Sequence, residues 1–226
     1  MNDIDQVPFA YPDLVANPEP RCPCLLLLDT SGSMNGRPID ELNAGLRVFK
    51  EELASDSMAM QRVEVALMTF GPVQVLSEFQ TADLFHPPTL TTTGDTPMGA
   101  AIMQGLDLLE ARKATYRQAG VSYYRPWVFM ITDGGPTDNW HQAAERVRAG
   151  DSAERKAFSF FAVAVDGADM TKLTSICSPN RPPMKLKGLS FRELFSWLSS
   201  SLGGVAKSQP GQLVALPAPS GWSSVG

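Results

Sequence analysis

Three short apolar runs, each followed by an aspartate, constrain the fold of this 226-residue chain most strongly. The first run begins at Cys24 and ends at Asp29, and the others end at Asp133 and Asp166. Continuous apolar runs of this length, bounded by turn-forming residues, are typical of strands that are buried on both faces of a parallel sheet. A sheet of this kind needs helices on both faces, because each face is too apolar to be left in water.

Helical patterns alternate with these runs, as such a sheet requires. Apolar residues recur at helical spacing over residues 39–53, 98–109 and 191–202, and a weaker helix is expected over residues 139–147. Residues 63–70 and 73–80 are rich in strand-forming residues and are separated only by Gly71 and Pro72, which predicts a hairpin. The hairpin places one antiparallel strand at an edge of the sheet, and residues 183–189 are expected to form a last edge strand.

We therefore predict an α/β fold, a doubly wound, Rossmann-like and mostly parallel sheet with one antiparallel edge strand and helices on both faces. Residues 24–206 form this single domain, after a Pro-rich N-terminal leader over residues 1–23. Residues 207–226 form a Pro-rich C-terminal tail. We expect the tail to pack on the domain through its apolar side chains, which are Leu213, Val214, Leu216 and Trp222.

Charge and hydropathy exclude several classes of partner. The net charge is −5 and the 19 Lys and Arg residues are dispersed, so the chain offers no basic stripe for nucleic acid. No apolar run approaches the roughly 20 residues that cross a bilayer. The acidic first residues lack the pattern of a secretory signal. We therefore expect a cytoplasmic protein that binds neither nucleic acid nor a membrane.

The three cysteines, Cys22, Cys24 and Cys177, are too few for a disulfide framework. Cys22 and Cys24 flank a proline and could bind a soft metal or form a redox pair, but no second Cys or His pair completes a tetrahedral site. Buried structural thiols are the favoured interpretation.

Oxygen-bearing side chains gather in three loops next to the predicted buried elements. Asp29, Ser31 and Ser33 alternate after the first strand, Thr96 precedes a predicted helix, and Asp133 follows another strand. An all-oxygen set without His or Cys favours Mg²⁺ over zinc, with Mn²⁺ or Ca²⁺ as alternatives. Because only two of the five groups are carboxylates, the ion could take a further acidic ligand from a partner.

Local geometry gives four further expectations. If the backbone stays extended through Ser33, the alternating side chains point to one side of the chain. Thr96 is expected at the N-cap of a helix whose first residue is Pro97. Asp138 is expected to cap the helix near Trp140, and the third aspartate, Asp166, is expected to end its strand in a turn.

These five residues resemble the metal-ion-dependent adhesion site of von Willebrand factor A domains, which has a D-x-S-x-S motif, a later threonine and a later aspartate. The resemblance implies a doubly wound sheet with the ion at its top. It also implies that the hydroxyls of Ser31, Ser33 and Thr96 are direct ligands. The carboxylates of Asp29 and Asp133 would bind the ion directly or through water.

Longer stretches resemble the bacterial TerY/YegL branch of this family, which is associated with tellurium-resistance and stress operons. They are FGPVQVLSEF, TPMGAAI, RPPMKLKGLSFRELFSWLSSSL and PAPSGW. The resemblance implies a non-enzymatic scaffold or signalling module that acts with a protein kinase and a metal-dependent protein phosphatase, and whose partner presents an acidic residue. One departure is Asp95, where many relatives carry glycine. A solvated loop charge is the favoured interpretation of Asp95, and a water-mediated contact to the ion is the alternative.

Two enzyme classes are alternatives. An aspartate after a buried strand is also the nucleophile of haloacid-dehalogenase-like phosphohydrolases, so Asp29 could attack phosphorus in a Mg²⁺-dependent reaction. Those enzymes carry a second aspartate as the general acid where this chain has Ser31. A Ser-His-Asp hydrolase is weaker, because His86 and His141 are the only histidines and no Gly-x-Ser-x-Gly elbow surrounds Ser31 or Ser33.

Overall fold

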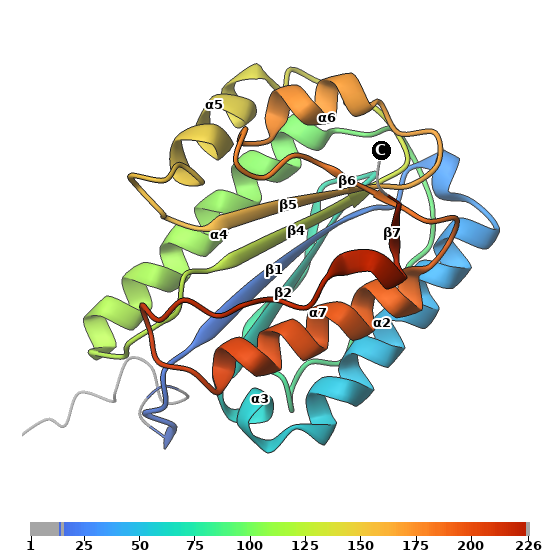
Figure 1. Cartoon of the computed structure of the whole chain (residues 1–226). Coiled ribbons are helices and arrows are strands. Elements are labelled where there is room, and N and C mark those ends of the chain that lie inside the picture. The colour runs from blue at the N-terminus through green and yellow to red at the C-terminus, as the bar shows by residue number, and fades with distance from the viewer. Residues whose placement is uncertain (1–13, 15, 225–226) are drawn as a thin grey trace, which may run out of the picture.

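The computed structural model describes residue 14 and residues 16–224. Its strands form one seven-stranded sheet in the order β3-β2-β1-β4-β5-β6-β7 (Figure 1). The strands are β1 (Cys22–Asp29), β2 (Val63–Phe70), β3 (Gln74–Thr81), β4 (Trp127–Thr132), β5 (Ser159–Ala164), β6 (Met184–Leu186) and β7 (Ser223–Ser224). All neighbouring strands are parallel except β3 on β2 and β7 on β6. The predicted doubly wound, mostly parallel sheet is therefore confirmed.

The helices lie on both faces of this sheet (Figure 1). They are α2 (Arg37–Ser55), α3 (Ser57–Arg62), α4 (Met98–Ala119), α5 (His141–Gly150), α6 (Met170–Ile176) and α7 (Phe191–Ala206), with short 3₁₀ turns η1 (Gly32–Met34) and η2 (Pro219–Gly221). Helices α2 and α7 pack on one face and α4, α5 and α6 cover the other, so two hydrophobic cores sandwich the sheet. No helix in the described part of the chain is long and apolar enough to cross a membrane.

The apolar run of β1 supplies both cores. Leu26 and Leu28 belong to the core beneath α2 and α7, whereas Leu25 and Leu27 belong to the core beneath α4 and α5. Successive side chains of a strand point to opposite faces, so a central strand between two helical layers must be apolar at every position. The leucines therefore fix the strand that ends at Asp29.

The strand order reverses between β1 and β4. The chain passes from β1 to β2 and β3 on one side and then returns to β4 on the other side of β1. Ligands of doubly wound sheets bind at the carboxyl ends of the strands where the order reverses. Asp29 ends β1 and Asp133 directly follows β4, so both aspartates lie at this position.

The cysteines are buried and unpaired. Burial raises the pKa of the Cys22 and Cys177 thiols to about 12 and the pKa of the Cys24 thiol well above its usual range. Thiols of this kind stay protonated at neutral pH, which makes them poor metal ligands and poor nucleophiles. Their environment fits the structural interpretation.

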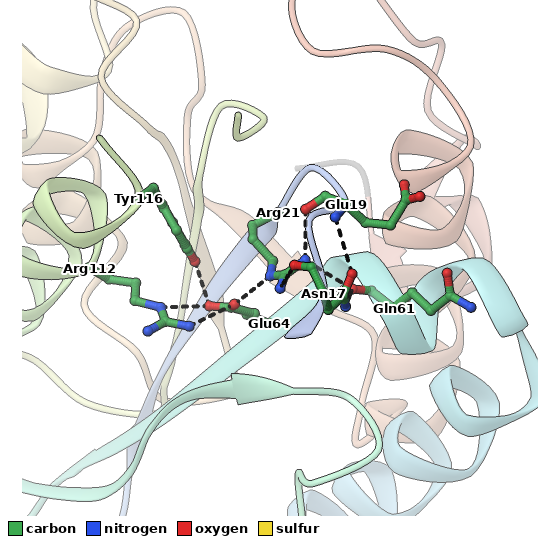
Figure 2. Close-up of polar contacts among 7 residues, drawn as sticks. All are labelled: Asn17, Glu19, Arg21, Gln61, Glu64, Arg112 and Tyr116. Atoms are coloured by element: carbon green, nitrogen blue, oxygen red, sulfur yellow. Dashed lines mark hydrogen bonds and ion pairs between the residues drawn. The ribbon is translucent and has the colours of Figure 1, made fainter. Parts of the chain in front are cut away.

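A buried ionic cluster, which we call the Glu64 cluster, joins residues 17–21 to the end of the sheet opposite Asp29 (Figure 2). The Glu64 carboxylate accepts hydrogen bonds from Arg21 Nε at 2.9 Å, from Arg112 Nε and Nη2 at 2.8 Å each, and from Tyr116 Oη at 2.5 Å. Glu64 and Arg21 are fully buried. Arg21 also donates to the backbone oxygens of residues 17 and 19, so this part of the predicted leader is built into the fold.

The C-terminal tail departs from the expected edge of the sheet. The tail forms a second antiparallel strand, β7, so β6 is an interior strand and not the last one. Its side chains pack unequally: Trp222 is buried and Val214 is half-buried, whereas 98% of Leu213 and 37% of Leu216 are exposed. Residues 1–13, 15, 225 and 226, which include most of the predicted leader, lie outside the described residues.

Candidate metal centre

The loop after β1 is held in place by backbone hydrogen bonds to two other loops. Thr30 N–H donates to Phe70 O at 3.0 Å, and Thr30 O accepts from Thr93 N–H at 2.8 Å. Gly32 N–H donates to Gly94 O at 3.1 Å. These bonds join the loop that carries Asp29, Ser31 and Ser33 to the end of β2 and to the segment that leads to Thr96.

Asp29 is fully buried at the tip of β1, and each of its carboxylate oxygens accepts a hydrogen bond. Ser31 N–H donates to Oδ1 at 2.9 Å, and Thr132 Oγ1 donates to Oδ2 at 2.5 Å. Burial raises the pKa of Asp29 above its ordinary value, and the nearby Asp133 charge adds to the rise, although the hydrogen bonds from Ser31 and Thr132 oppose it. The two donors fix the orientation of the carboxylate.

Three oxygens form a row beside Asp29. Ser31 Oγ and Ser33 Oγ lie 3.1 Å apart, and Ser33 Oγ donates to Asp133 Oδ1 at 2.7 Å. The backbone is extended at Ser31 and then turns into η1, so the expectation of an extended chain through Ser33 is wrong. The 3₁₀ turn nevertheless brings both hydroxyls together, because it folds the chain back by one short turn.

The spacing of this row, which is that of the hydrogen bonds within it, is also compatible with a small octahedral ion. Ligands at about 2.0–2.1 Å from Mg²⁺ in an octahedron lie about 2.9 Å from their neighbours. The distances of 3.1 Å and 2.7 Å along the row bracket this value. Ser31, Ser33 and Asp133 could therefore occupy adjacent positions around one ion with small adjustments.

Thr96 is buried next to the loop that follows β4. Its backbone is held by Thr137, which accepts from Thr96 N–H through Oγ1 at 3.2 Å and donates its own N–H to Thr96 O at 3.0 Å. A Cβ atom added to Gly134 would lie 3.4 Å from Thr96 Oγ1, so Gly134 lets the Thr96 hydroxyl approach the Asp133 loop closely. The structure thus brings all five predicted side chains to one end of the sheet.

The start of α4 differs from the expected one. The helix begins at Met98 with Pro97 at the N-cap, one residue later than predicted. The expectation for Asp138 is also wrong, because its carboxylate caps α4 by accepting from Gly99 N–H at 2.9 Å and Ala100 N–H at 2.7 Å. The helix therefore does not need the Thr96 side chain as its cap, and a residue from the loop after β4 locks the two loops together.

Asp95 and Asp166 lie outside this arrangement. Asp95 is exposed on the loop before α4, in keeping with a solvated charge. Asp166 lies in the turn after β5, as predicted, and pairs with Lys185 Nζ at 3.4 Å. Among the described residues, no group of three or more His, Cys, Asp or Glu side chains is placed to hold a metal ion. A metal at this end of the sheet would therefore depend on the hydroxyls.

Two residues that support the site were not predicted from the sequence. Thr132 donates to Asp29 and accepts from Gly134 N–H at 3.1 Å, so one hydroxyl ties the ends of β1 and β4 together. Gly71 has φ of +125°, and an added Cβ atom would lie 2.6 Å from Ser31 N. Their positions in the sequence are suggestive, since Thr132 precedes Asp133 and Gly71 directly follows β2. Neither position, however, indicates a contact with the loop that carries Ser31.

The donor set is hard, oxygen-rich and partly buried, which suits Mg²⁺, Mn²⁺ or Ca²⁺ better than a soft ion. A protein-family model also matches most of the chain. The model of the von Willebrand factor type A domain matches residues 25–193. The chain belongs to the von Willebrand factor type A family. No curated protein sequence matches this von Willebrand factor type A chain.

Solved structures share the fold of this von Willebrand factor type A chain at low identity. The open conformation of the pilus adhesin SpaC from Lactobacillus rhamnosus GG has a TM-score of 0.64 at 12% identity and covers 84% of this chain and 31% of its own. The VWA domain of SpRpn10 has a TM-score of 0.53 at 13% identity and covers 73% of this chain and 86% of its own.

A third similar structure is proximal thread matrix protein 1 from the mussel byssus, in a form with a zinc-occupied MIDAS motif. It has a TM-score of 0.50 at 15% identity and covers 84% of this chain and 47% of its own. This chain therefore spans about half of the mussel protein and about a third of the adhesin. At these identities the similarity shows the fold.

Proposed function

We propose that this chain is a non-enzymatic, metal-dependent protein-interaction module whose bound ion is completed by a carboxylate of a partner. The observation that carries the proposal is the row of Ser31, Ser33 and Asp133 oxygens at the spacing of adjacent octahedral ligands. Asp29, at the start of the loop that carries the two serines, and Thr96, from the loop before α4, complete the set.

The five side chains would hold the ion in different ways. Ser31, Ser33 and Thr96 would supply neutral hydroxyl oxygens, and Asp133 would supply a carboxylate. The Asp29 carboxylate is already oriented by Ser31 N–H and Thr132 Oγ1, and it would accept from a metal-bound water through a lone pair that these two donors do not use. When bound, the ion supplies a Lewis-acidic position that favours an anionic oxygen ligand.

Mg²⁺ is the ion that this donor set favours, with Mn²⁺ and Ca²⁺ as alternatives. The mussel protein carries zinc in its MIDAS motif, which supports a divalent ion in a site of this kind. The set in this chain has neither His nor Cys, the ligands that zinc prefers.

The phosphohydrolase alternative is less well supported. A nucleophilic carboxylate needs an oxygen exposed to the phosphorus atom, whereas both oxygens of the fully buried Asp29 accept hydrogen bonds. The position of the general acid holds Ser31, which is a poor proton donor at neutral pH. This alternative predicts Mg²⁺-dependent phosphatase turnover that disappears in Asp29→Asn.

The resemblance to the TerY/YegL branch supports a finer proposal. We infer that the partners belong to a bacterial tellurium-resistance or stress-response system and include a protein kinase and a metal-dependent protein phosphatase. The acidic partner residue would then bind the ion, so metal occupancy would control assembly of the complex in the cytoplasm.

Affinity capture from a native host, with and without chelator and scored by mass spectrometry, tests the proposal. Wild-type protein is expected to retain partners only with Mg²⁺, and Asp29→Ala or Thr96→Ala should lose them while the circular dichroism of the fold is unchanged. Asp166→Ala is the matched control, because Asp166 also follows a strand at this end of the sheet but is exposed and outside the site. Chelator-insensitive capture by the site variants contradicts the proposal.

A further inference from the structure

A groove of about 450 Å³ lies at the end of the sheet opposite the candidate metal centre. Aromatic side chains from the amino ends of β4 and β5 and from the preceding loop line it, namely Tyr124, Trp127 and Phe161. Val205 of α7 lines it as well. The ring centroids of Trp127 and Phe161 are 5.1 Å apart, and both rings are buried in the core, so they form the floor of the groove.

An irregular segment of the tail, residues 209–218, which we call the strap, runs along this groove. The strap is the dark red trace between α7 and the strands in Figure 1. Tyr124 Oη donates to Ser208 O at 2.5 Å just before it, and Trp197 Nε1 donates to Pro217 O at 2.8 Å near its end. Residues between these anchors line the groove, including Leu213 and Val214. The strap is thus fastened at both ends and leaves space beneath its middle.

The groove is positively charged although the chain is acidic overall. Arg125, Lys156 and Arg181 line it, and no acidic side chain does so in the described part of the chain. Buried Asp151 accepts hydrogen bonds from Arg125 at 2.7 Å and from Arg181, and so orients both guanidinium groups. One buried carboxylate is opposed by three cations, which leaves a net positive charge at the groove.

Arg181 joins the charged and apolar parts of the groove. Its guanidinium carbon lies 4.9 Å from the centroid of the Phe161 ring. A molecule that placed an apolar body between Val205 and the strap would therefore bring an attached anionic group next to Arg181 and Lys156. Pockets of about 300–1,000 Å³ that are mostly apolar, with a few convergent polar groups, are typical small-molecule sites.

We propose that this groove binds a small organic anion, a carboxylate attached to an apolar or aromatic body. The strap favours a small molecule over a peptide, because a strap fastened at both ends limits the length of any chain that could lie beneath it. Charge complementarity favours an anion, and the aromatic surface favours an apolar body. This inference is independent of the metal centre.

The first test uses 8-anilinonaphthalene-1-sulfonate as an anionic probe and N-phenyl-1-naphthylamine as its neutral counterpart. The anionic probe is expected to bind one site per chain and to be displaced by decanoate, whereas the neutral probe should bind at least about tenfold more weakly. Equal affinity of the two probes, or no displacement by decanoate, overturns the proposal.

Substitutions at the groove test whether the anionic probe binds there. Lys156→Gln removes an exposed cation at the groove and should weaken the anionic probe about threefold to tenfold. Lys172→Gln, at a partly exposed lysine on α6 outside the groove, is the matched control and should leave its affinity unchanged. Val214→Trp should fill the space beneath the strap and abolish binding. Unchanged affinity in Lys156→Gln and Val214→Trp places the probe elsewhere and overturns the proposal.

Discussion

Thr132→Val tests how the site is held together. Valine has nearly the same shape as threonine but cannot donate to Asp29 Oδ2, which receives the Thr132 hydroxyl at 2.5 Å. A hydrogen bond to a charged group contributes about 1.5–3 kcal/mol to stability, and Asp29 is fully buried, so water cannot replace the lost donor. We expect the free energy of unfolding to fall by about this amount, measured by urea unfolding with a chelator present.

The same variant should weaken metal binding, because a residue that orients a ligand costs about 10–100-fold in affinity when it is removed. Titration calorimetry with Mg²⁺ measures this effect. Thr174→Val is the matched control, since Thr174 is exposed on α6 and donates only to a carbonyl of its own helix. A stability loss below about 0.5 kcal/mol in Thr132→Val, together with unchanged Mg²⁺ affinity, would show that the Thr132 hydroxyl does not hold Asp29 in place.

Two further substitutions and one labelling experiment probe the fold and the site. Glu64→Gln leaves the fully buried Arg21 without its counter-charge and should lower the free energy of unfolding by about 3–5 kcal/mol in urea titrations. Gly71→Ala combines a φ of +125° with a Cβ contact of 2.6 Å to Ser31 N, so it should lower stability by at least about 1–3 kcal/mol and weaken Mg²⁺ binding in calorimetry. The cysteines should resist Ellman's reagent at pH 8 until urea unfolds the chain. Because burial raises the pKa of the Cys22 thiol from 9.0 to about 12, its contribution to stability is complete below pH 9 and is lost as the pH rises through 12.

Each of the two substitutions has a control, and the labelling experiment has an outcome that contradicts it. Asp107→Asn removes the partner of an exposed ion pair and should cost less than about 1 kcal/mol, so an equal loss in Glu64→Gln contradicts the role of the Glu64 cluster. Gly120→Ala has the same kind of positive φ but open space around the new Cβ atom, so only Gly71→Ala should affect Mg²⁺ binding. Rapid labelling of the folded protein at pH 8 contradicts the buried state of the thiols.

The sequence predicts the parts of the site that depend on strand ends. Asp29 and Asp133 follow apolar runs that had to be central strands, and parallel strands bring their carboxyl ends to one edge. The place of the Ser31 and Ser33 hydroxyls in the site was predictable because both residues lie close to Asp29 in the sequence. The segment that joins them is a 3₁₀ turn and not the extended chain that was expected.

Contacts between distant segments were not predictable in the same way. Thr132 donates to a residue 103 positions away, and Asp138 caps a helix that begins about 40 positions earlier, in preference to the helix next to it. A local sequence pattern indicates which residues could make a hydrogen bond, but it does not indicate which loop lies next to them in the fold. The pairing of β7 with β6 and the burial of Arg21 depend in the same way on tertiary packing.

The count of Mn²⁺ ions bound per chain, measured by electron paramagnetic resonance, tests whether the five side chains form a metal site. Mn²⁺ takes the same oxygen ligands as Mg²⁺ and reports its own bound fraction. We expect one Mn²⁺ per wild-type chain, displaced by Mg²⁺, and none in folded Asp29→Ala or Thr96→Ala. No bound Mn²⁺ in the wild type, or one in each of these variants, would contradict it.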